Sequence, residues 1–290
     1  MKIIQVHRRD AEAQRKPRKM FARCLCASAV SLILSLGWTA SAETRQERGK
    51  RVVEEALQAL GGNAFLQMQD RVETGRAYSF YRLQITGLSI AHIYTRYLTA
   101  PNPPVPGDLE VRERQTFGKQ EEDVILLTEK QGWEVTFRGA RPLEDKQYSN
   151  FKDSTLKNFF YILRQRFNEP GLSFYAQDSD FYENRPVEIV DITDADNNTV
   201  TVYFDHFSHL PVKQSFRRRN PDYHDFDTEV TVWNKFRDVG NGVKWPFDTH
   251  RDRNGEKIFE MYSDSVAINQ DLKDNLFTLP TSVKVLPKPK

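Results

Sequence analysis

The sequence predicts a mainly β (α+β) protein, in which about ten or eleven antiparallel strands form one large curved sheet and two or more helices cover its concave face. Two observations lead to this fold class. From Arg71 onward, apolar and polar residues alternate with a period of two, which is typical of strands with one wet face. Only two segments have apolar residues at helical spacing, and helices are the only elements available to cover the apolar face of such a sheet.

Residues 1–42 have the three parts of a secretory signal. Basic residues precede an apolar run from Ala27 to Gly37, and the small residues Ala40-Ser41-Ala42 follow at the spacing that a signal peptidase accepts. Cleavage after Ala42 would leave residues 43–290 as the mature chain, which we expect to form a single domain. The working protein is therefore expected to be periplasmic or extracytoplasmic, and soluble after signal cleavage.

Both cysteines lie before the apolar run, at Cys24 and Cys26, whereas the cysteine of a lipoprotein signal would follow it directly. The mature chain is therefore expected to have no lipid anchor, no disulfide and no thiolate metal site. An uncleaved anchor helix is the alternative, because Phe21 to Ala42 approach the roughly 20 residues that span a bilayer. Met20 is an alternative true start of the chain.

The charge balance of the mature chain is mildly acidic. Of the 42 Lys or Arg and 40 Asp or Glu, 8 and 2 lie in residues 1–42, which leaves 34 and 38 in the mature chain and a net charge near −4. Binding to phosphates relies on clustered basic charge, so we expect no nucleic-acid partner.

The mature chain opens with a predicted amphipathic helix. Gly61-Gly62 ends it, because the left-handed position after a helix favours glycine. The opposite face is rich in Arg, Lys and Glu, so the apolar face is expected to pack on the core. That face consists of Val52, Val53, Ala56, Leu57 and Leu60.

Alternation and turn residues predict the strands that follow. Asp194 to Asn198 forms a polar turn between two of them, and Asn254-Gly255 is a strong hairpin turn. The alternating apolar residues include Leu109, Val111 and Phe117; Trp133, Val135 and Phe137; Val187 and Ile189; Val200, Val202 and Phe204; Val230 and Val232; and Val243, Trp245 and Phe247.

A second helix is predicted in the middle of the strands. Asp153 or Ser154 can cap its start, and Pro170-Gly171 ends it. Its wide apolar face either fills the core or acts as a lid that meets a hydrophobic ligand. The face consists of Leu156, Phe159, Phe160, Leu163 and Phe167.

Motifs for catalysis and metal binding are missing from the sequence. His206 and His209 lie on a predicted hairpin tip without a third ligand, so we expect no metal there. The chain has no Gly-x-Ser-x-Gly and no His-Glu-x-x-His. Two carboxylates could flank a glycosidic bond, but the sequence singles out no pair. We therefore expect no catalysis, no metal and no cofactor.

Several motifs resemble those of one family. They are Leu60-Gly61-Gly62 after the first helix, Lys130-Gln131-Gly132-Trp133 at a strand start, the hairpin from Tyr203 to Val212, the segment from Phe236 to Pro246, and the closing segment from Asn269 to Pro280. Together they resemble the outer-membrane lipoprotein-sorting superfamily, the LolA- and LolB-like carriers and their longer relatives, over most of residues 45–280. This chain is longer than the typical carrier, and His209 stands where a glycine is usual.

The resemblance implies an unclosed antiparallel β-barrel whose mouth is plugged by helices and whose cavity holds acyl chains, without catalysis. We expect a lipid or acyl chain as the ligand, with an envelope protein as another class of partner and transient membrane contact. The predicted cavity-lining residues are Trp133, Phe137, Phe159, Phe160, Leu163 and Phe167. Two alternatives are an extracytoplasmic hydrolase acting through carboxylates and an envelope adaptor that binds proteins through its sheet edges.

Overall fold

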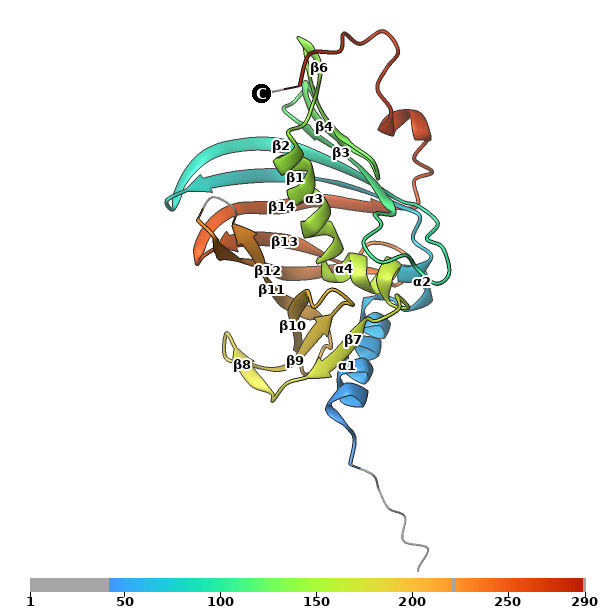
Figure 1. Ribbon diagram of the computed structural model, residues 1–290, viewed down its shortest axis with the longest axis vertical. Helices are drawn as coiled ribbons and strands as arrows, with labels where there is room; N and C mark the ends of the chain where they lie inside the picture. Colours follow the sequence, from blue (N-terminus) through green and yellow to red (C-terminus); the bar gives the residue numbers. More distant parts are fainter. Residues whose placement is uncertain (1–41, 221–222, 289–290) are drawn as a thin grey trace, which may run out of the picture. The chain divides into compact units, whose positions relative to one another are not determined.

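Fourteen strands form one antiparallel sheet in the computed structural model, which describes residues 42–220 and 223–288. The predicted signal, residues 1–42, lies outside the described residues apart from Ala42. The sheet consists of two successive meanders (Figure 1). The first contains β1 (Asp70–Tyr81), β2 (Gln84–Tyr97), β3 (Val111–Phe117), β4 (Asp123–Leu127), β5 (Gly132–Thr136) and β6 (Gly139–Pro142). The second contains β7 (Ser173–Ala176), β8 (Asp180–Tyr182), β9 (Arg185–Thr193), β10 (Thr199–Asp205), β11 (Pro211–Asn220), β12 (Asp225–Asp238), β13 (Lys244–Arg253) and β14 (Glu256–Ile268).

The pairing of β1 with β14 joins the two meanders, while β6 and β7 lie at opposite ends of the strand order. The sheet is therefore unclosed, and the predicted fold class is confirmed. The strand number exceeds the ten or eleven predicted, because β6, β7 and β8 have only 4, 4 and 3 residues. Strands this short do not show enough alternation to be recognised.

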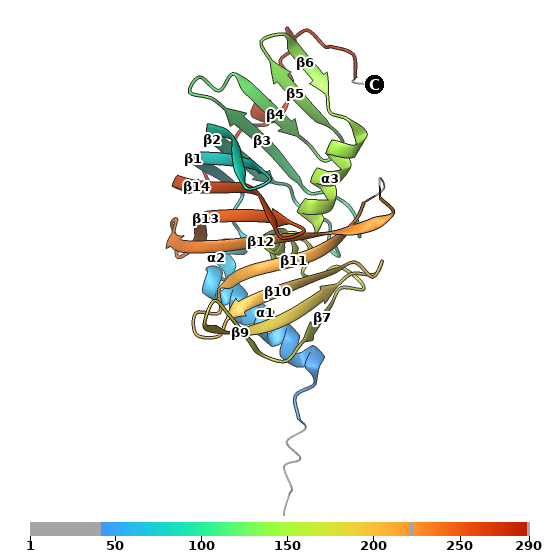
Figure 2. The same cartoon turned by 90° about the vertical axis from the view of Figure 1, so that its left-hand side faces the viewer.

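Helices lie on one face of this sheet. They are α1 (Arg45–Leu60), α2 (Asn63–Leu66), α3 (Asp145–Leu156), α4 (Phe159–Tyr161) and the π-helical turn η1 (Ile162–Arg166); a 3-10 turn, η2 (Asp274–Phe277), follows the last strand. Figures 1 and 2 show α3 running crosswise over the strands, while α1 lies beside β7 and β9. Among the described residues, no helix is long and apolar enough to cross a membrane.

The prediction for the first helix is confirmed, since all five residues of its apolar face are buried. Its start is a capping box that the sequence analysis missed. The Thr44 hydroxyl accepts from the Glu47 amide, and the Glu47 carboxylate accepts from the Thr44 amide. This exchange satisfies two amides that a helix start otherwise leaves without a partner.

The second predicted helix is wrong in its extent. Helix α3 begins at Asp145, eight residues before the predicted cap, and ends at Leu156. A new start follows at Asn158, whose side chain accepts from the amides of Phe160 and Tyr161. Because Asn158 competes for the backbone in this way, the chain turns, and Phe159 is separated from the axis of α3.

Both ends of the sheet are covered by other segments of the chain. The Ala140 amide of β6 donates to the Lys284 carbonyl (2.9 Å), and the Leu286 amide donates to the Ala140 carbonyl (2.8 Å). At the other end α1 packs on β7, where a Cβ added to Gly49 would lie 2.8 Å from the Phe174 backbone. These covers occupy the edges at which another chain could add a strand.

The main apolar core lies where α1, α2, α4 and η1 meet the second meander. Its fully buried aromatic side chains include Phe65, Phe159 and Phe204, and the rings of Phe159 and Phe204 make an edge-to-face contact at 5.1 Å. Smaller side chains from α1, such as Val53, fill the remaining space. This part of the concave face is therefore solidly packed.

Candidate functional site

A cavity of about 280 Å³ lies between α3 and the sheet, next to the solid core. Strands β1–β3 and β11–β14 provide one wall, while α3 and the start of α4 provide the other. The volume lies near the lower end of the roughly 300–1,000 Å³ that is usual for small-molecule sites.

Apolar side chains form part of the lining. Phe160 packs between Trp233 and Trp245, with ring centroids 4.9 and 4.8 Å away. Further along the sheet the lining includes Ile93, Phe259 and Met261. This part of the wall can accept an apolar ligand.

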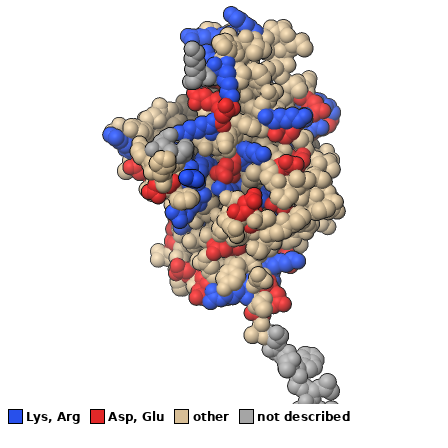
Figure 3. Space-filling view, viewed as in Figure 1, with Lys and Arg blue, Asp and Glu red and all other residues tan. Residues whose placement is uncertain are grey.

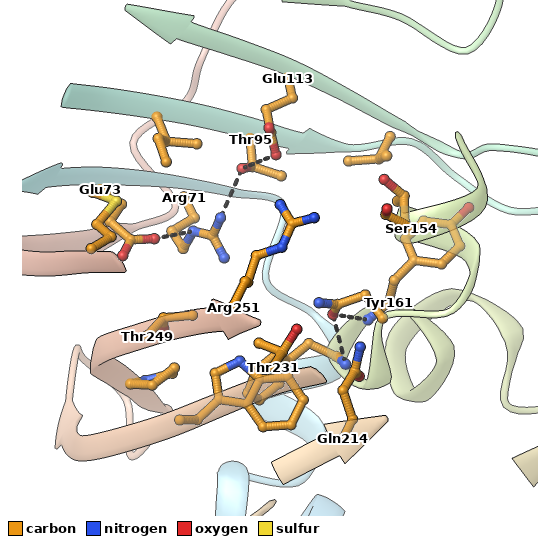
Figure 4. Close-up of a pocket in the computed structure, with 18 of the residues that line it drawn as sticks. Arg71, Glu73, Thr95, Glu113, Ser154, Tyr161, Gln214, Thr231, Thr249 and Arg251 are labelled. Carbon is orange, nitrogen blue, oxygen red and sulfur yellow. Dashed lines mark hydrogen bonds and ion pairs between the residues drawn. The ribbon is translucent and has the colours of Figure 1, made fainter. Parts of the chain in front are cut away.

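A polar row crosses the sheet beside these residues (Figure 4). Arg71, Thr95 and Glu113 stand directly opposite one another on β1, β2 and β3. The Arg71 guanidinium donates to the Thr95 hydroxyl (3.0 Å), which donates in turn to the Glu113 carboxylate (3.5 Å). The same guanidinium lies 4.0 Å from the ring centroid of Trp245, which supports it by a cation–π contact.

Two of the three carboxylates that line the cavity have cationic partners. Glu73 lies 3.6 Å from the Arg71 guanidinium and accepts from the Ser263 hydroxyl. Glu229 accepts from Arg253 at 2.8 Å and lies 3.6 Å from Arg218. Figure 3 shows that basic and acidic side chains are also interspersed over the molecular face that includes α3.

The third carboxylate, Glu113, has no ion pair within the described residues. Gln115 donates to it at 2.5 Å, and burial raises its pKa despite that hydrogen bond and the nearby Arg71. The neutral acid is therefore favoured more strongly at Glu113 than in a solvated glutamate.

Polar contacts hold α3 over the cavity. The Arg218 guanidinium on β11 donates to the Asp153 carboxylate (3.0 Å) and to the Ser154 hydroxyl. Helix α3 has no buried residue, although Phe151 and Leu156 pack partly against a small cluster near Tyr161. Helix α3 is therefore attached through polar groups and a limited apolar contact.

The six predicted ligand-binding residues do not share one interior. Phe160 lines the cavity, Phe159 and Leu163 lie in the solid core, and Phe167 packs on Phe174 with centroids 5.4 Å apart. Trp133 on β5 lies away from the cavity lining, paired with Leu126 and Pro142.

Phe137 is the residue whose position differs most from expectation. It is 90% exposed, because Phe137 and Arg138 form the two-residue turn between β5 and β6. The alternation that begins at Trp133 stops at Thr136, where Gly139 with φ 132° allows the chain to turn. The role of the six residues in ligand binding stays a prediction, and Phe160 is the one that the geometry favours.

Sequence reasoning missed the polar lining, although the sequence contains a signal for it. Val111, Glu113 and Phe117 have the same strand parity, as do Trp245 and Arg251. Charged residues at positions that alternation assigns to the inner face are uncommon in a core, because their burial costs free energy. Glu113 and Arg251 share a strand face with apolar residues, and this pattern could have indicated a polar cavity.

The histidines of the predicted hairpin tip point to different carboxylates. His206 lies 3.1 Å from Glu188, and His209 lies 3.6 Å from Glu55. His209 has φ 56°, a left-handed conformation that explains why a glycine suits this position.

Within the described residues, one group has its ligand atoms close enough for a metal ion: Asp248, His250 and Glu260. Lys235 lies 3.1 Å from Asp248, and Lys257 lies 3.1 Å from Glu260. These ammonium groups already neutralise the two carboxylates, so the group is a poor metal site.

No protein-family model and no curated protein sequence matches the chain. Solved structures are similar. An outer membrane lipoprotein-sorting protein domain, as its structure is named, from Vibrio parahaemolyticus matches with a TM-score of 0.54 and 12% identity, over 80% of this chain and 97% of that chain. The chain has the lipoprotein-sorting fold. A DUF1329 family protein from Desulfovibrio piger matches with a TM-score of 0.56 and 9% identity, over 81% of this chain and 98% of that chain.

At these identities the likeness is one of fold, and it confirms the fold that the sequence motifs implied. Both matches cover nearly the whole of the other chain and about four fifths of this one.

Proposed function

We propose that the mature chain is an exported, non-catalytic protein of the cell envelope that holds or carries a hydrophobic ligand, such as a lipid or an acyl chain. The observation that supports this most directly is the cavity under α3, which Phe160, Trp233 and Trp245 border on one side. The lipoprotein-sorting fold supports the same function, since the Vibrio parahaemolyticus domain is named for lipoprotein sorting.

Sequestration is the proposed mechanism. Each methylene group moved from water into the cavity gains about 0.8 kcal/mol. Helix α3 would act as the lid, because it has no buried residue and its contacts to Arg218 are polar. Its displacement would widen the cavity while the solid core under α1 and α4 stays intact.

The cavity volume favours a ligand with one chain. At about 280 Å³ the space is smaller than a typical drug-sized site, so several acyl chains would require α3 to move. Carrying the several acyl chains of a lipoprotein would thus require α3 to move, whereas binding a single-chain lipid would not.

Mass spectrometry of lipids that co-purify with protein from the cell envelope tests the function. We expect one apolar or amphiphilic class to be enriched, and a fluorescent fatty-acid probe to be displaced by it. Purified protein that binds neither the probe nor any co-purifying lipid would contradict the proposal.

Export is tested separately. N-terminal sequencing of the protein from the envelope should begin at Glu43, since Ala40 and Ala42 are small residues at the cleavage site. A mature protein that retains Leu32 would instead support the anchor helix.

A hydrolase is the second candidate, and one observation favours it. Glu73 and Glu113 both line the cavity, and burial raises the pKa of Glu113, as a general acid requires. However, Glu73 is already occupied by Arg71 and Ser263. Hydrolysis of a glycoside or ester library that is abolished in Glu113→Gln would establish this candidate.

The adaptor alternative is weakened, because α1 and residues 284–286 cover the sheet edges.

A further inference from the structure

Arg251 is a cation in the cavity that has no partner in the part of the chain that the structure describes. Its side chain is half-buried on β13 and lines the cavity. Among the described residues it has no hydrogen bond and no ion pair, whereas Arg71, Arg218 and Arg253 each have one. In Figure 4 its guanidinium projects into the space between the two walls. A guanidinium has five N–H donors, so that of Arg251 can donate several hydrogen bonds to a ligand in the cavity.

Two hydroxyl groups stand beside it. Thr231 lies directly opposite Arg251 on β12, and Thr249 precedes it by two residues on the same face of β13. Neither hydroxyl has a hydrogen bond to another described residue. The three side chains therefore add donors to the lining of the same cavity.

The surrounding charges favour an anion in this region. Burial lowers the pKa of Arg251, and the neighbouring Arg218 and Arg253 lower it further, against the attraction of Glu229 and Glu113. Glu229 is already paired with Arg253 and Arg218. Burial also raises the pKa of Glu113, which disfavours the charged form of that carboxyl. An anion would supply both the missing acceptors and the missing charge.

We propose that Arg251, with Thr231 and Thr249, binds the anionic head group of a single-chain amphiphile, a carboxylate or a phosphate monoester. The chain of the amphiphile would lie against the apolar lining at Phe259 and Met261, which border the same cavity. This inference rests on the proposed function and names the class of ligand.

The test compares ligands that share a chain and differ in the head group. Decanoate, decyl phosphate, 1-decanol and decylamine compete against a dansyl-labelled fatty-acid probe on the mature protein. We expect decanoate or decyl phosphate to bind at least tenfold more tightly than 1-decanol, and decylamine to bind most weakly. The ratio between decanoate and decyl phosphate distinguishes a carboxylate head group from a phosphate one.

Variants assign the preference to Arg251. Arg251→Met should reduce the affinity for the preferred anion to that for 1-decanol without changing 1-decanol itself, and Arg251→Lys should retain part of the preference. Arg217→Met is the matched control, because Arg217 is exposed on the opposite face of β11. Without ligand, Arg251→Met should melt at the same temperature as the wild type or higher, whereas a structural role would lower its melting temperature.

The failures of the two proposals are distinguishable. Equal affinity for decanoate, decyl phosphate and 1-decanol would overturn the anion site and leave the hydrophobic-ligand function standing. Thermal stabilisation by butyl phosphate that is lost in Arg251→Met, without binding of any ten-carbon ligand, would support the anion site and overturn the carrier function. Binding of none of these compounds would overturn both.

Discussion

The two parts of the concave face are covered by helices in the same way but are filled differently. Under α1 and α4, aromatic and aliphatic side chains fill the space, the buried Gln214 accepts from the Phe159 amide, and α1 alone buries six residues. Under α3, which buries none, the sheet presents arginines, glutamates and threonines to a cavity. The comparison teaches that one sheet can separate the two tasks, with stability in the solid part and binding capacity in the polar part.

The difference follows from what burial costs. Apolar surface stabilises the fold in proportion to the area removed from water. A buried charge instead loses its hydration free energy, which only ion pairs and hydrogen bonds to partners can offset. In the polar part Glu73 and Glu229 have partners, while Arg251 and Glu113 have no ion pair with any residue that the structure describes. Groups held at such a cost are characteristic of functional sites.

The largest expected effect tests the solid part. Phe159→Ala removes a fully buried ring that contacts Phe204, so we expect a loss of about 3–5 kcal/mol in the free energy of unfolding. Phe151→Ala on α3 removes a partly exposed ring and should cost less than about 1.5 kcal/mol. Urea denaturation measures both, and similar losses would contradict the division into two parts.

The next effect concerns the packing of α1 on the sheet edge. A Cβ at Gly49 would lie 2.8 Å from the backbone of Phe174 and Ala176, so Gly49→Ala should cost about 1–3 kcal/mol. This loss would occur although alanine favours a helix by about 1 kcal/mol over glycine. The neighbouring exposed Lys50→Ala is the control, with an expected change within about 0.5 kcal/mol. A stabilised Gly49→Ala would show that α1 has room to withdraw from β7.

A smaller global effect is expected at the attachment of α3. Arg218→Met removes hydrogen bonds to Asp153 and Ser154, and Glu229 retains Arg253. We expect a loss of about 1–3 kcal/mol and faster hydrogen exchange of the α3 amides, with α1 amides little changed. Unchanged exchange in α3 would mean that Arg218 does not hold the lid.

The smallest effect is a pH dependence at Glu113. Its pKa is raised in the folded protein, so between the ordinary value of 4.5 and the folded pKa the native state holds more protons than the unfolded state. Stability from the neutral carboxyl is thus fully present below 4.5 and is lost as the pH rises through the folded pKa. Glu113→Gln should therefore be more stable than the wild type at neutral pH, with the difference shrinking toward pH 4.5.

Denaturation midpoints across this pH range measure the difference. Glu256→Gln, at an exposed position beside a hairpin turn, controls for the loss of a carboxylate. Parallel profiles of the wild type and Glu113→Gln would contradict the assignment.

Local sequence signals predicted the elements that depend on neighbours in the chain. The apolar face of α1 and the hairpin turn at Asn254-Gly255 are both confirmed, since helical spacing and left-handed turn residues act within a few positions. The break at Asn158 was missed, because its side-chain cap competes with a helical pattern that continues through Phe160 and Leu163.

The sequence by itself determined that the chain forms a curved antiparallel sheet with helices on one face, because the alternation of strands and the periodicity of helices are both patterns of residues close together in the chain. Only the tertiary structure decided which inner positions form a cavity. Arg71, Glu113 and Arg251 come from strands β1, β3 and β13, and their meeting depends on the pairing of β1 with β14 across nearly 200 residues. The partners that neutralise Glu229 come from the neighbouring strands β11 and β13, and Arg251 has none among the described residues. These contacts depend on how the strands pair, which consecutive residues do not specify.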